Sequence, residues 1–328
     1  SPLAGIRPPL PEDWQTQRHT RTHLHGAGLA LFSLRTAGVI GRESERSHLW
    51  RALRRVVGNQ RAECVLIEGT SGSGTSTLAQ WLATRAHEIG GVRCRVVHHS
   101  SMRGDADGMS ALLSWSLPIQ GLDRADAIEQ TNKHLSANGM PDLDDAIGLV
   151  QLARQHERVD EGQGLSADFS NQTERIALLS RYFIAQAERR ALILWLDNLH
   201  LASEGMALAE HLLKIDLDVP LMILGTVATE EVHEGTDLSS RLEALVSRPN
   251  TSRIQLKPLD TDGQVALIRE LLGLDLALAA TVEQRCGGNP QFAVQLVSDW
   301  VERGLLVPSE EGFTLRPGAD TAIPNDMI

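Results

Sequence analysis

The chain has 328 residues, of which 42% are hydrophobic, and its formal net charge is -11 at pH 7. This length favours two domains, and the acidic balance argues against a nucleic-acid-binding surface, which requires concentrated Lys and Arg. No apolar run approaches the roughly 18 residues that cross a bilayer, and the first residues lack a signal-peptide pattern. A cytoplasmic protein without membrane contact is therefore expected. The three isolated cysteines suggest neither a disulfide framework nor a zinc site.

The first part of the chain divides into a linker and a helix. Residues 1–36 are rich in Pro and polar residues and lack a periodic apolar pattern, which predicts an irregular N-terminal extension. From residue 39, apolar side chains such as Leu49 and Leu53 recur at spacings of three and four behind a charged first turn. This spacing predicts an amphipathic helix.

A strand, a glycine-rich turn and a second helix follow without a gap. The run ECVLIEG at 63–69 is short, apolar and β-branched, as in a buried parallel strand. The run STLAQWLATRAHEIGG at 76–91 has a helical pattern and ends at two glycines. A glycine-rich turn in this context is a candidate phosphate-binding loop.

Further strands are expected at 93–99, 191–198, 221–227 and 252–259, with helical stretches between them. Alternating strands and helices predict a parallel sheet sandwiched by helices, which is the α/β class of the P-loop NTPases. We therefore place a P-loop NTPase-like domain at residues 37–260, with a helical insertion at about 100–190.

The C-terminal part predicts two smaller units. Residues 261–307 are strongly helical and suggest a lid domain. Residues 308–328 contain a hairpin signal around Glu311 and Gly312, which we interpret as a hairpin and the truncated start of a following, winged-helix-like domain. Because both ends resemble linkers, the chain is expected to be a segment of a longer protein.

The turn after the first strand matches the phosphate-binding pattern G-x-x-x-x-G-K-[ST] except at one position. Thr75 stands where the pattern has lysine, the residue that bridges the β- and γ-phosphates, while Ser76 keeps the hydroxyl that coordinates Mg²⁺. Backbone N–H groups and the helix dipole can still hold phosphate. The loop residues expected to line the site are Gly69, Thr70, Ser71, Gly72, Ser73, Gly74, Thr75, Ser76 and Thr77.

A second motif supports a nucleotide site. The apolar run LILWLDN ends with Asp197, at the position of the acidic residue that holds Mg²⁺. A lone Asp at a strand end is more often a turn residue, and a Gly/Ser-rich turn alone can join any strand to a helix, so the combination carries the inference. The next residue is Asn198, whose amide can orient a water but cannot accept its proton. General-base assistance, worth about 10²–10⁴-fold, should therefore be absent.

Four short motifs together resemble the AAA-like module of the signal-transduction ATPases with numerous domains, the STAND class. These motifs are GVIGRESERSHLWRAL, GTSGSGTST, LILWLDNLH and GGNPQFAVQL, and the resemblance covers residues 37–307. It implies ATP or ADP as the ligand, with Mg²⁺ held by Ser76 and Asp197. The resemblance implies a nucleotide-base environment formed by Val39, Ile40, Gly41, Arg42, Asn289 and Pro290.

Three positions depart from that family. Thr75 replaces the lysine, Asn198 replaces a second acid, and Ala228 lies where many relatives carry an arginine that senses the nucleotide. Losing one preorganised charge costs about 3–4 kcal/mol of transition-state stabilisation. The first hypothesis is therefore a pseudo-ATPase, at most a very slow ATPase, that binds nucleotide weakly and acts as a regulatory or assembly scaffold.

Two alternatives remain open. In the first, the chain is an active ATP-dependent switch in which Arg42 or a partner chain supplies the missing charge. In the second, it is a purely structural interaction domain. The run GAGLALFSLRTAGVIGRESER at 26–46 also resembles the junction where a Ser/Thr protein kinase domain precedes such a module in bacterial signalling proteins. This resemblance implies other domains of a longer chain, a protein partner or self-association.

Other conspicuous residues need no ligand. The six tryptophans, including Trp81 and Trp195, are expected at core positions of helices and strands. His98 and His99 are adjacent on a predicted strand, so they point to opposite faces and are poorly placed to bind one metal ion.

Overall fold

The computed structural model describes residues 10–15, 39–89, 91–101, 107–155, 172–214, 217–268, 274–309 and 312–318. Most of the linker predicted for residues 1–36, and the chain beyond residue 318, lie outside the described residues. None of the helices in the described part is long and apolar enough to cross a membrane.

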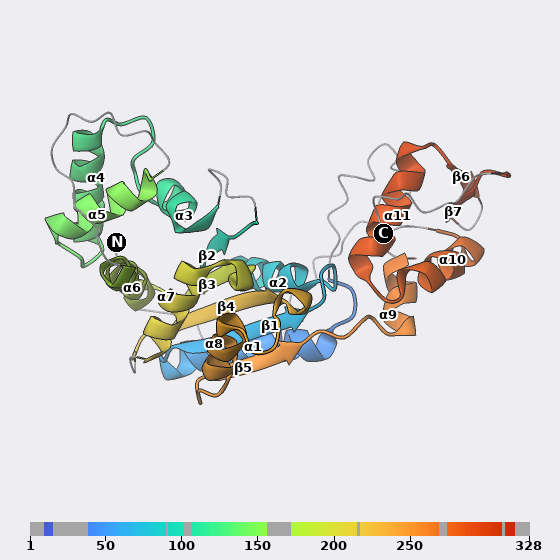
Figure 1. Cartoon of the computed structure of the whole chain (residues 1–328), viewed down its shortest axis with the longest axis horizontal. Helices are drawn as coiled ribbons and strands as arrows, with labels where there is room; N and C mark the ends of the chain where they lie inside the picture. Colours follow the sequence, from blue (N-terminus) through green and yellow to red (C-terminus); the bar gives the residue numbers. More distant parts are fainter. Residues whose placement is uncertain are drawn as a thin grey trace.

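A parallel sheet forms the centre of the molecule (Figure 1). In the described ranges it has five strands in the order β2-β3-β4-β1-β5, and all of its pairings are parallel. The strands are β1 (Glu63–Gly69), β2 (Arg93–His98), β3 (Leu192–Asp197), β4 (Leu221–Ala228) and β5 (Thr251–Gln255). The central strands are buried along nearly their whole length, as their apolar runs predict. The predicted P-loop NTPase class of fold is confirmed.

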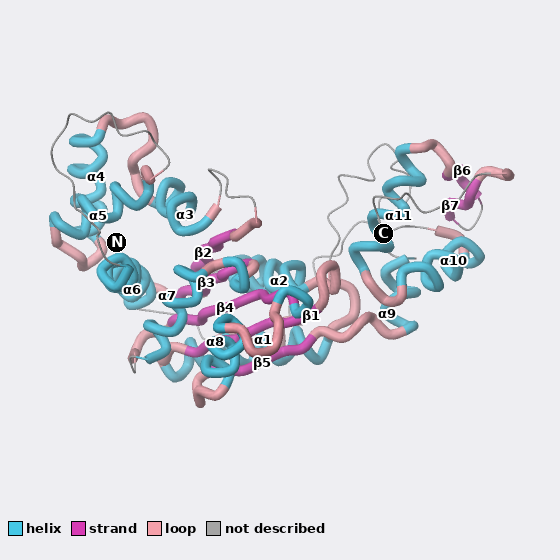
Figure 2. The backbone as a smooth tube through the Cα atoms, viewed as in Figure 1, coloured by secondary structure: helices cyan, strands magenta, loops and turns pink. Residues whose placement is uncertain are grey.

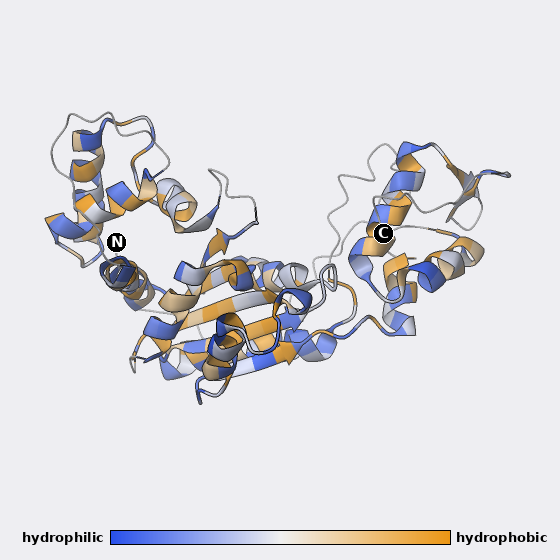
Figure 3. Cartoon of the chain, in the orientation of Figure 1, coloured by the Kyte–Doolittle hydropathy of each residue, from blue (hydrophilic) through white to orange (hydrophobic). Residues whose placement is uncertain are grey.

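Helices cover both faces of this sheet. Val65 and Ile67 of β1 pack in one cluster with residues of α1 (Glu43–Asn59) and α2 (Thr75–Glu88). Cys64 and Leu66 of the same strand belong to the opposite cluster, together with residues of α6 (Gln172–Arg189), α7 (Ser203–Lys214) and α8 (Asp237–Val246). This alternation follows from the two-residue period of a strand, and Figure 3 shows the strands as a largely apolar layer.

A helical insertion lies beyond the β2 edge of the sheet (Figure 1). It consists of α3 (Gly108–Ser116), α4 (Arg124–Ala137), α5 (Leu143–Ala153) and α6. The expectation that all six tryptophans lie in the core was wrong for this region, because Trp115 on α3 is 81% exposed. Trp50, Trp195 and Trp300 are buried as expected.

The C-terminal part lies at the other end of the sheet and has its own core (Figure 2). It contains α9 (Thr261–Ala266), α10 (Leu276–Cys286), α11 (Pro290–Glu302) and the antiparallel strands β6 (Leu306–Ser309) and β7 (Gly312–Leu315). The N-terminal segment before α1 joins the two parts, because Val39 packs against the sheet cluster whereas Ile40 packs against the C-terminal cluster.

Candidate functional site

The glycine-rich turn connects β1 to α2 and has the backbone that its sequence predicts. Gly72 and Gly74 have φ angles of 77° and 97°, in the left-handed region that disfavours other residues. A Cβ atom on Gly69 would clash with the Ser73 hydroxyl. Ser73 is buried, and its Oγ atom has no hydrogen-bond partner among the described residues. A turn with a buried, unpartnered hydroxyl fits a phosphate ligand.

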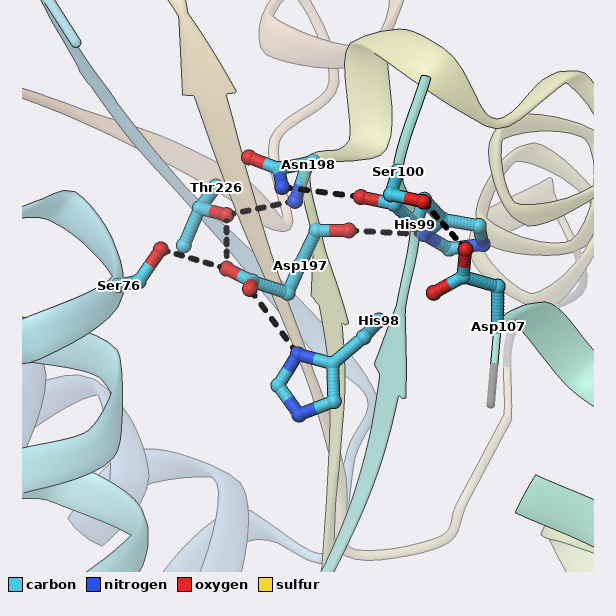
Figure 4. Close-up of polar contacts among 8 residues, drawn as sticks. All are labelled: Ser76, His98, His99, Ser100, Asp107, Asp197, Asn198 and Thr226. Carbon is cyan, nitrogen blue, oxygen red and sulfur yellow. Dashed lines mark hydrogen bonds and ion pairs between the residues drawn. The ribbon is translucent and has the colours of Figure 1, made fainter. Parts of the chain in front are cut away.

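Ser76 and Asp197, the two residues predicted to hold Mg²⁺, are in direct contact (Figure 4). The Ser76 hydroxyl donates to Asp197 Oδ1 over 2.7 Å, and the Thr226 hydroxyl donates to the same oxygen over 2.7 Å. Their convergence arises because Asp197 ends β3 beside the start of α2. One hydroxyl and one buried carboxylate suit a hard cation such as Mg²⁺.

Histidine side chains at the end of β2 complete the surroundings of Asp197. His98 Nδ1 lies 3.1 Å from Asp197 Oδ2, and His99 Nδ1 lies 2.8 Å from the Asp197 main-chain oxygen (Figure 4). The adjacent histidines thus approach Asp197 through different groups, consistent with their opposite orientation on the strand. Burial lowers the pKa of His99, which favours its neutral form.

Asn198 follows Asp197 and has a φ angle of 53°. Its main-chain N–H donates to the Thr226 hydroxyl over 2.9 Å, and its side-chain nitrogen donates to the His99 carbonyl over 2.9 Å (Figure 4). Asn198 therefore links the end of β3 to both neighbouring strands, to β4 through its main chain and to the residue after β2 through its side chain. It offers no group that can accept a proton from an attacking water.

Arg42, the residue that would replace the lysine in the active-switch alternative, is bound to other groups. It has a φ angle of 62° and precedes α1. Its guanidinium donates to the Lys257 carbonyl over 2.6 Å and to the Ser73 carbonyl over 3.4 Å, and it lies 3.4 Å from the Glu45 carboxylate. Arg42 therefore contacts the phosphate-binding loop through a carbonyl, while its charge is shared with Glu45.

An acidic residue that the sequence analysis missed also contacts the loop. Glu230 lies in the short helix η3 (Thr229–Glu231) after β4, and its Oε1 atom accepts a hydrogen bond from the Ser71 N–H over 2.6 Å. Loop N–H groups of this kind hold phosphate oxygens in P-loop proteins. The Glu230 carboxylate thus occupies a loop N–H group that could otherwise bind a phosphate oxygen. Its sequence signal was a Glu-Glu pair just after Ala228, where the resemblance implies an arginine.

The start of α11 rests on the same loop. Asn289 Nδ2 donates to the Ser71 carbonyl over 3.0 Å, and the Gln291 N–H donates to the Gly72 carbonyl over 3.2 Å. A Cβ atom on Gly72 would lie 2.6 Å from Asn289 Oδ1, so only glycine fits beneath this residue. The structure therefore brings Asn289 and Pro290, which begins α11, to the phosphate-binding loop.

The chain matches the AAA ATPase domain family over residues 38–224, which is more than half of its length. It therefore belongs to the AAA ATPase domain family, and this membership indicates a nucleotide-binding function. No curated protein matches the chain.

Solved structures with a similar fold have low sequence identity. The Walker-type ATPase paby2304 of Pyrococcus abyssi has 15% identity and a TM-score of 0.40, with 84% of this chain and 72% of that chain covered. The Aeropyrum pernix ORC1 protein, solved in complex with DNA, has 15% identity and a TM-score of 0.48 over 81% of this chain and 60% of that chain. The ADP form of the Aeropyrum pernix ORC2 protein has 12% identity and a TM-score of 0.45 over 82% and 65% of the two chains. The chain thus spans less than two thirds of either ORC protein.

Proposed function

We propose that this AAA ATPase domain is a pseudo-ATPase of the STAND type. It binds ATP or ADP with Mg²⁺ weakly, hydrolyses little, and acts as a regulatory or assembly scaffold in a larger bacterial signalling protein. The observation that carries the proposal is the hydrogen bond from Ser71 to the Glu230 carboxylate, in a loop where Thr75 replaces the lysine.

Electrostatics support weak binding. A nucleotide phosphate would have to displace or approach Glu230, and the buried Asp197 carboxylate adds a second negative charge nearby. Like charges near a protein surface repel by up to a few kcal/mol at close range. Ser76 and Asp197 would hold Mg²⁺, which offsets part of this repulsion. Without the lysine, no side chain of the loop itself opposes it.

The surroundings of Asn198 support slow hydrolysis. Its side-chain nitrogen is bonded to the His99 carbonyl, and its amide cannot act as a general base. The absent lysine removes a further stabilising charge, typically worth about 10²–10³-fold in rate. Such factors do not simply multiply. The combined expectation is very slow hydrolysis.

Several features of the setting belong to the same proposal. Besides the nucleotide, the proposed partners are other domains of a longer chain, including a protein kinase domain. A protein partner or a second copy of the chain is also proposed. The proposal also includes a cytoplasmic location, and the net charge of -11 argues against a nucleic-acid-binding surface.

The second candidate function is an active ATP-dependent switch. It is favoured by Arg42, whose guanidinium already lies 3.4 Å from the Ser73 carbonyl in the loop. In that case Arg42, or an arginine from a partner chain, takes over the role of the lysine. Steady-state ATP hydrolysis at saturating Mg²⁺ separates the two candidates, because only the switch turns over.

The experiment that tests the first candidate restores the charge. Thr75→Lys is compared with Gln80→Lys, which adds the same charge to an exposed position further along α2 and outside the loop. Calorimetry should show that Thr75→Lys binds Mg-ATP at least tenfold more tightly, since a charge-assisted hydrogen bond contributes about 1.5–3 kcal/mol. Hydrolysis should stay slow. If both variants bind equally weakly, the loop does not hold phosphate, and a purely structural domain becomes the better account.

A further inference from the structure

A small cavity lies where β2 begins, at the opposite end of the sheet from the phosphate-binding loop. Arg93 of β2, His134 of α4, Asn138 after α4, and Tyr182 and Gln186 of α6 line it. Because the loop follows the carboxyl end of a parallel strand, a strand length of roughly 20 Å separates the two sites. The cavity is therefore independent of the nucleotide site.

The charge around this cavity is strongly positive. No carboxylate among the described residues pairs with Arg93. Burial is the main cause that lowers the pKa of Arg93, and the nearby guanidinium groups of Arg95, Arg190 and Arg189 lower it further. Burial also lowers the pKa of His134, as do Arg93 and Arg95. Like charges are thus concentrated at one place.

Helix ends do not balance this charge. Both α4 and α6 end beside the cavity, at Ala137 and Arg189, and a helix C-terminus carries about half a negative charge. Two such ends offset about one of the guanidinium charges. A net positive potential therefore remains.

A buried amide whose nitrogen lacks a hydrogen bond of normal geometry lines the same cavity. Gln186 is 7% exposed, and its Oε1 atom accepts a hydrogen bond from Arg95 Nε over 3.2 Å. This bond fixes the orientation of the amide, whose Nε2 atom lies near the Tyr182 hydroxyl but makes no hydrogen bond of normal geometry within the described part. An unsatisfied buried donor costs about 1–3 kcal/mol. A water molecule would satisfy the amide but would not balance the charge.

We propose that this cavity binds the phosphate group of a small phosphorylated ligand. Arg93 supplies the charge, since a guanidinium pairs well with phosphate oxygens, and Gln186 Nε2 and the Tyr182 hydroxyl donate hydrogen bonds. The cavity has a volume of about 20 Å³. That space is little more than the roughly 10–15 Å³ that one water requires, so one phosphate oxygen enters the cavity while the rest of the phosphate group and of the ligand lies at its mouth. The double charge of phosphate matches the surplus guanidinium charge better than a carboxylate does.

Titration with inorganic phosphate at constant ionic strength, followed by NMR chemical shifts, tests the proposal. Arg93→Gln should weaken phosphate binding at least tenfold. Gln186→Met, which removes the amide without changing charge, should weaken it several-fold. The matched control is Arg51→Gln, which removes an exposed arginine of α1 and should leave phosphate affinity unchanged. If Arg93→Gln fails to fold, Gln186→Met decides the outcome.

Two further measurements show at which site phosphate binds and whether the cavity prefers phosphate to a carboxylate. Thr75→Glu places a carboxylate in the phosphate-binding loop, so phosphate bound there would be lost while phosphate at Arg93 would remain. Acetate should bind at least tenfold more weakly than phosphate. The proposal is overturned by the absence of saturable phosphate binding, by affinity that Arg93→Gln and Gln186→Met leave unchanged, by loss of binding in Thr75→Glu, or by equal binding of acetate.

Discussion

Glu230 and Ser71 lie 159 positions apart in the sequence, yet the Glu230 carboxylate accepts a hydrogen bond from the Ser71 main-chain N–H. Replacing Glu230 with Gln removes the negative charge but keeps an oxygen acceptor for Ser71. Mg-ATP binding, measured by calorimetry, should therefore tighten several-fold, because repulsion between the carboxylate and the nucleotide phosphates disappears.

Glu231→Gln is the matched control for this substitution. It removes the same charge one residue further along η3, at an exposed position that makes no hydrogen bond or ion pair with the described residues of the loop. Its effect on Mg-ATP binding should be clearly smaller. Equal effects of the two substitutions would mean that the general negative charge, and not the bond to Ser71, weakens binding.

Single residues differ in how well the sequence predicts them. Thr75, Ser76 and Asp197 could be placed at one site because local motifs fix each of them. The contact of His98 with Asp197 could not, because it depends on the register in which β2 pairs with β3. Glu230 was missed for a similar reason, since the fold of the chain after β4 determines where its side chain lies.

At the scale of elements, the apolar runs determined most of the sheet. The predicted strand at 63–69 has the bounds of β1, and the other four strands were each placed within a few residues. Buried parallel strands are nearly continuous apolar runs, which makes them conspicuous. Trp115 shows the limit of this reasoning, because a helical pattern indicates an apolar side chain but not whether a neighbouring element covers it.

The α11 helix offers a test of how one element holds another. Asn289 Oδ1 accepts from the N–H groups of Gln291 and Phe292, while Nδ2 donates to the Ser71 carbonyl. Asn289→Asp keeps the cap but loses the donor and sets a carboxylate oxygen against that carbonyl. Hydrogen exchange should therefore become faster in loop residues 70–74, whereas the first turn of α11 should stay protected.

Asp275→Asn provides the control for that exchange measurement. Asp275 caps α10 by accepting from the Leu278 N–H, and among the described residues it makes no hydrogen bond or ion pair with the loop. This substitution should leave exchange in residues 70–74 unchanged. If Asn289→Asp also leaves it unchanged, α11 does not restrain the loop.

At the scale of the whole molecule, the phosphate-binding loop lies where the sheet domain and the C-terminal helices meet. A nucleotide can shift their arrangement only through different affinities for two arrangements, and a weak ligand has little to contribute. Ligand at a concentration equal to its dissociation constant stabilises a protein by about 0.4 kcal/mol. Millimolar Mg-ATP should therefore scarcely change the melting temperature or the oligomeric state.

The variant Ser76→Ala plus Asp197→Ala extends this prediction, because it removes both groups that would hold Mg²⁺. Light scattering and thermal unfolding of this variant should show the same small response to Mg-ATP as the unchanged chain. A shift of several degrees in the unchanged chain that disappears in the variant would identify a working nucleotide switch.

The affinity of the unchanged chain for Mg-ADP and Mg-ATP, measured by calorimetry, tests the central claim most directly. Glu230 at the Ser71 N–H and Thr75 in place of lysine predict dissociation constants well above the micromolar range for both nucleotides. Submicromolar binding of either nucleotide would contradict the account, because it would require a cation at the phosphates that neither the loop nor Arg42 supplies in this structure.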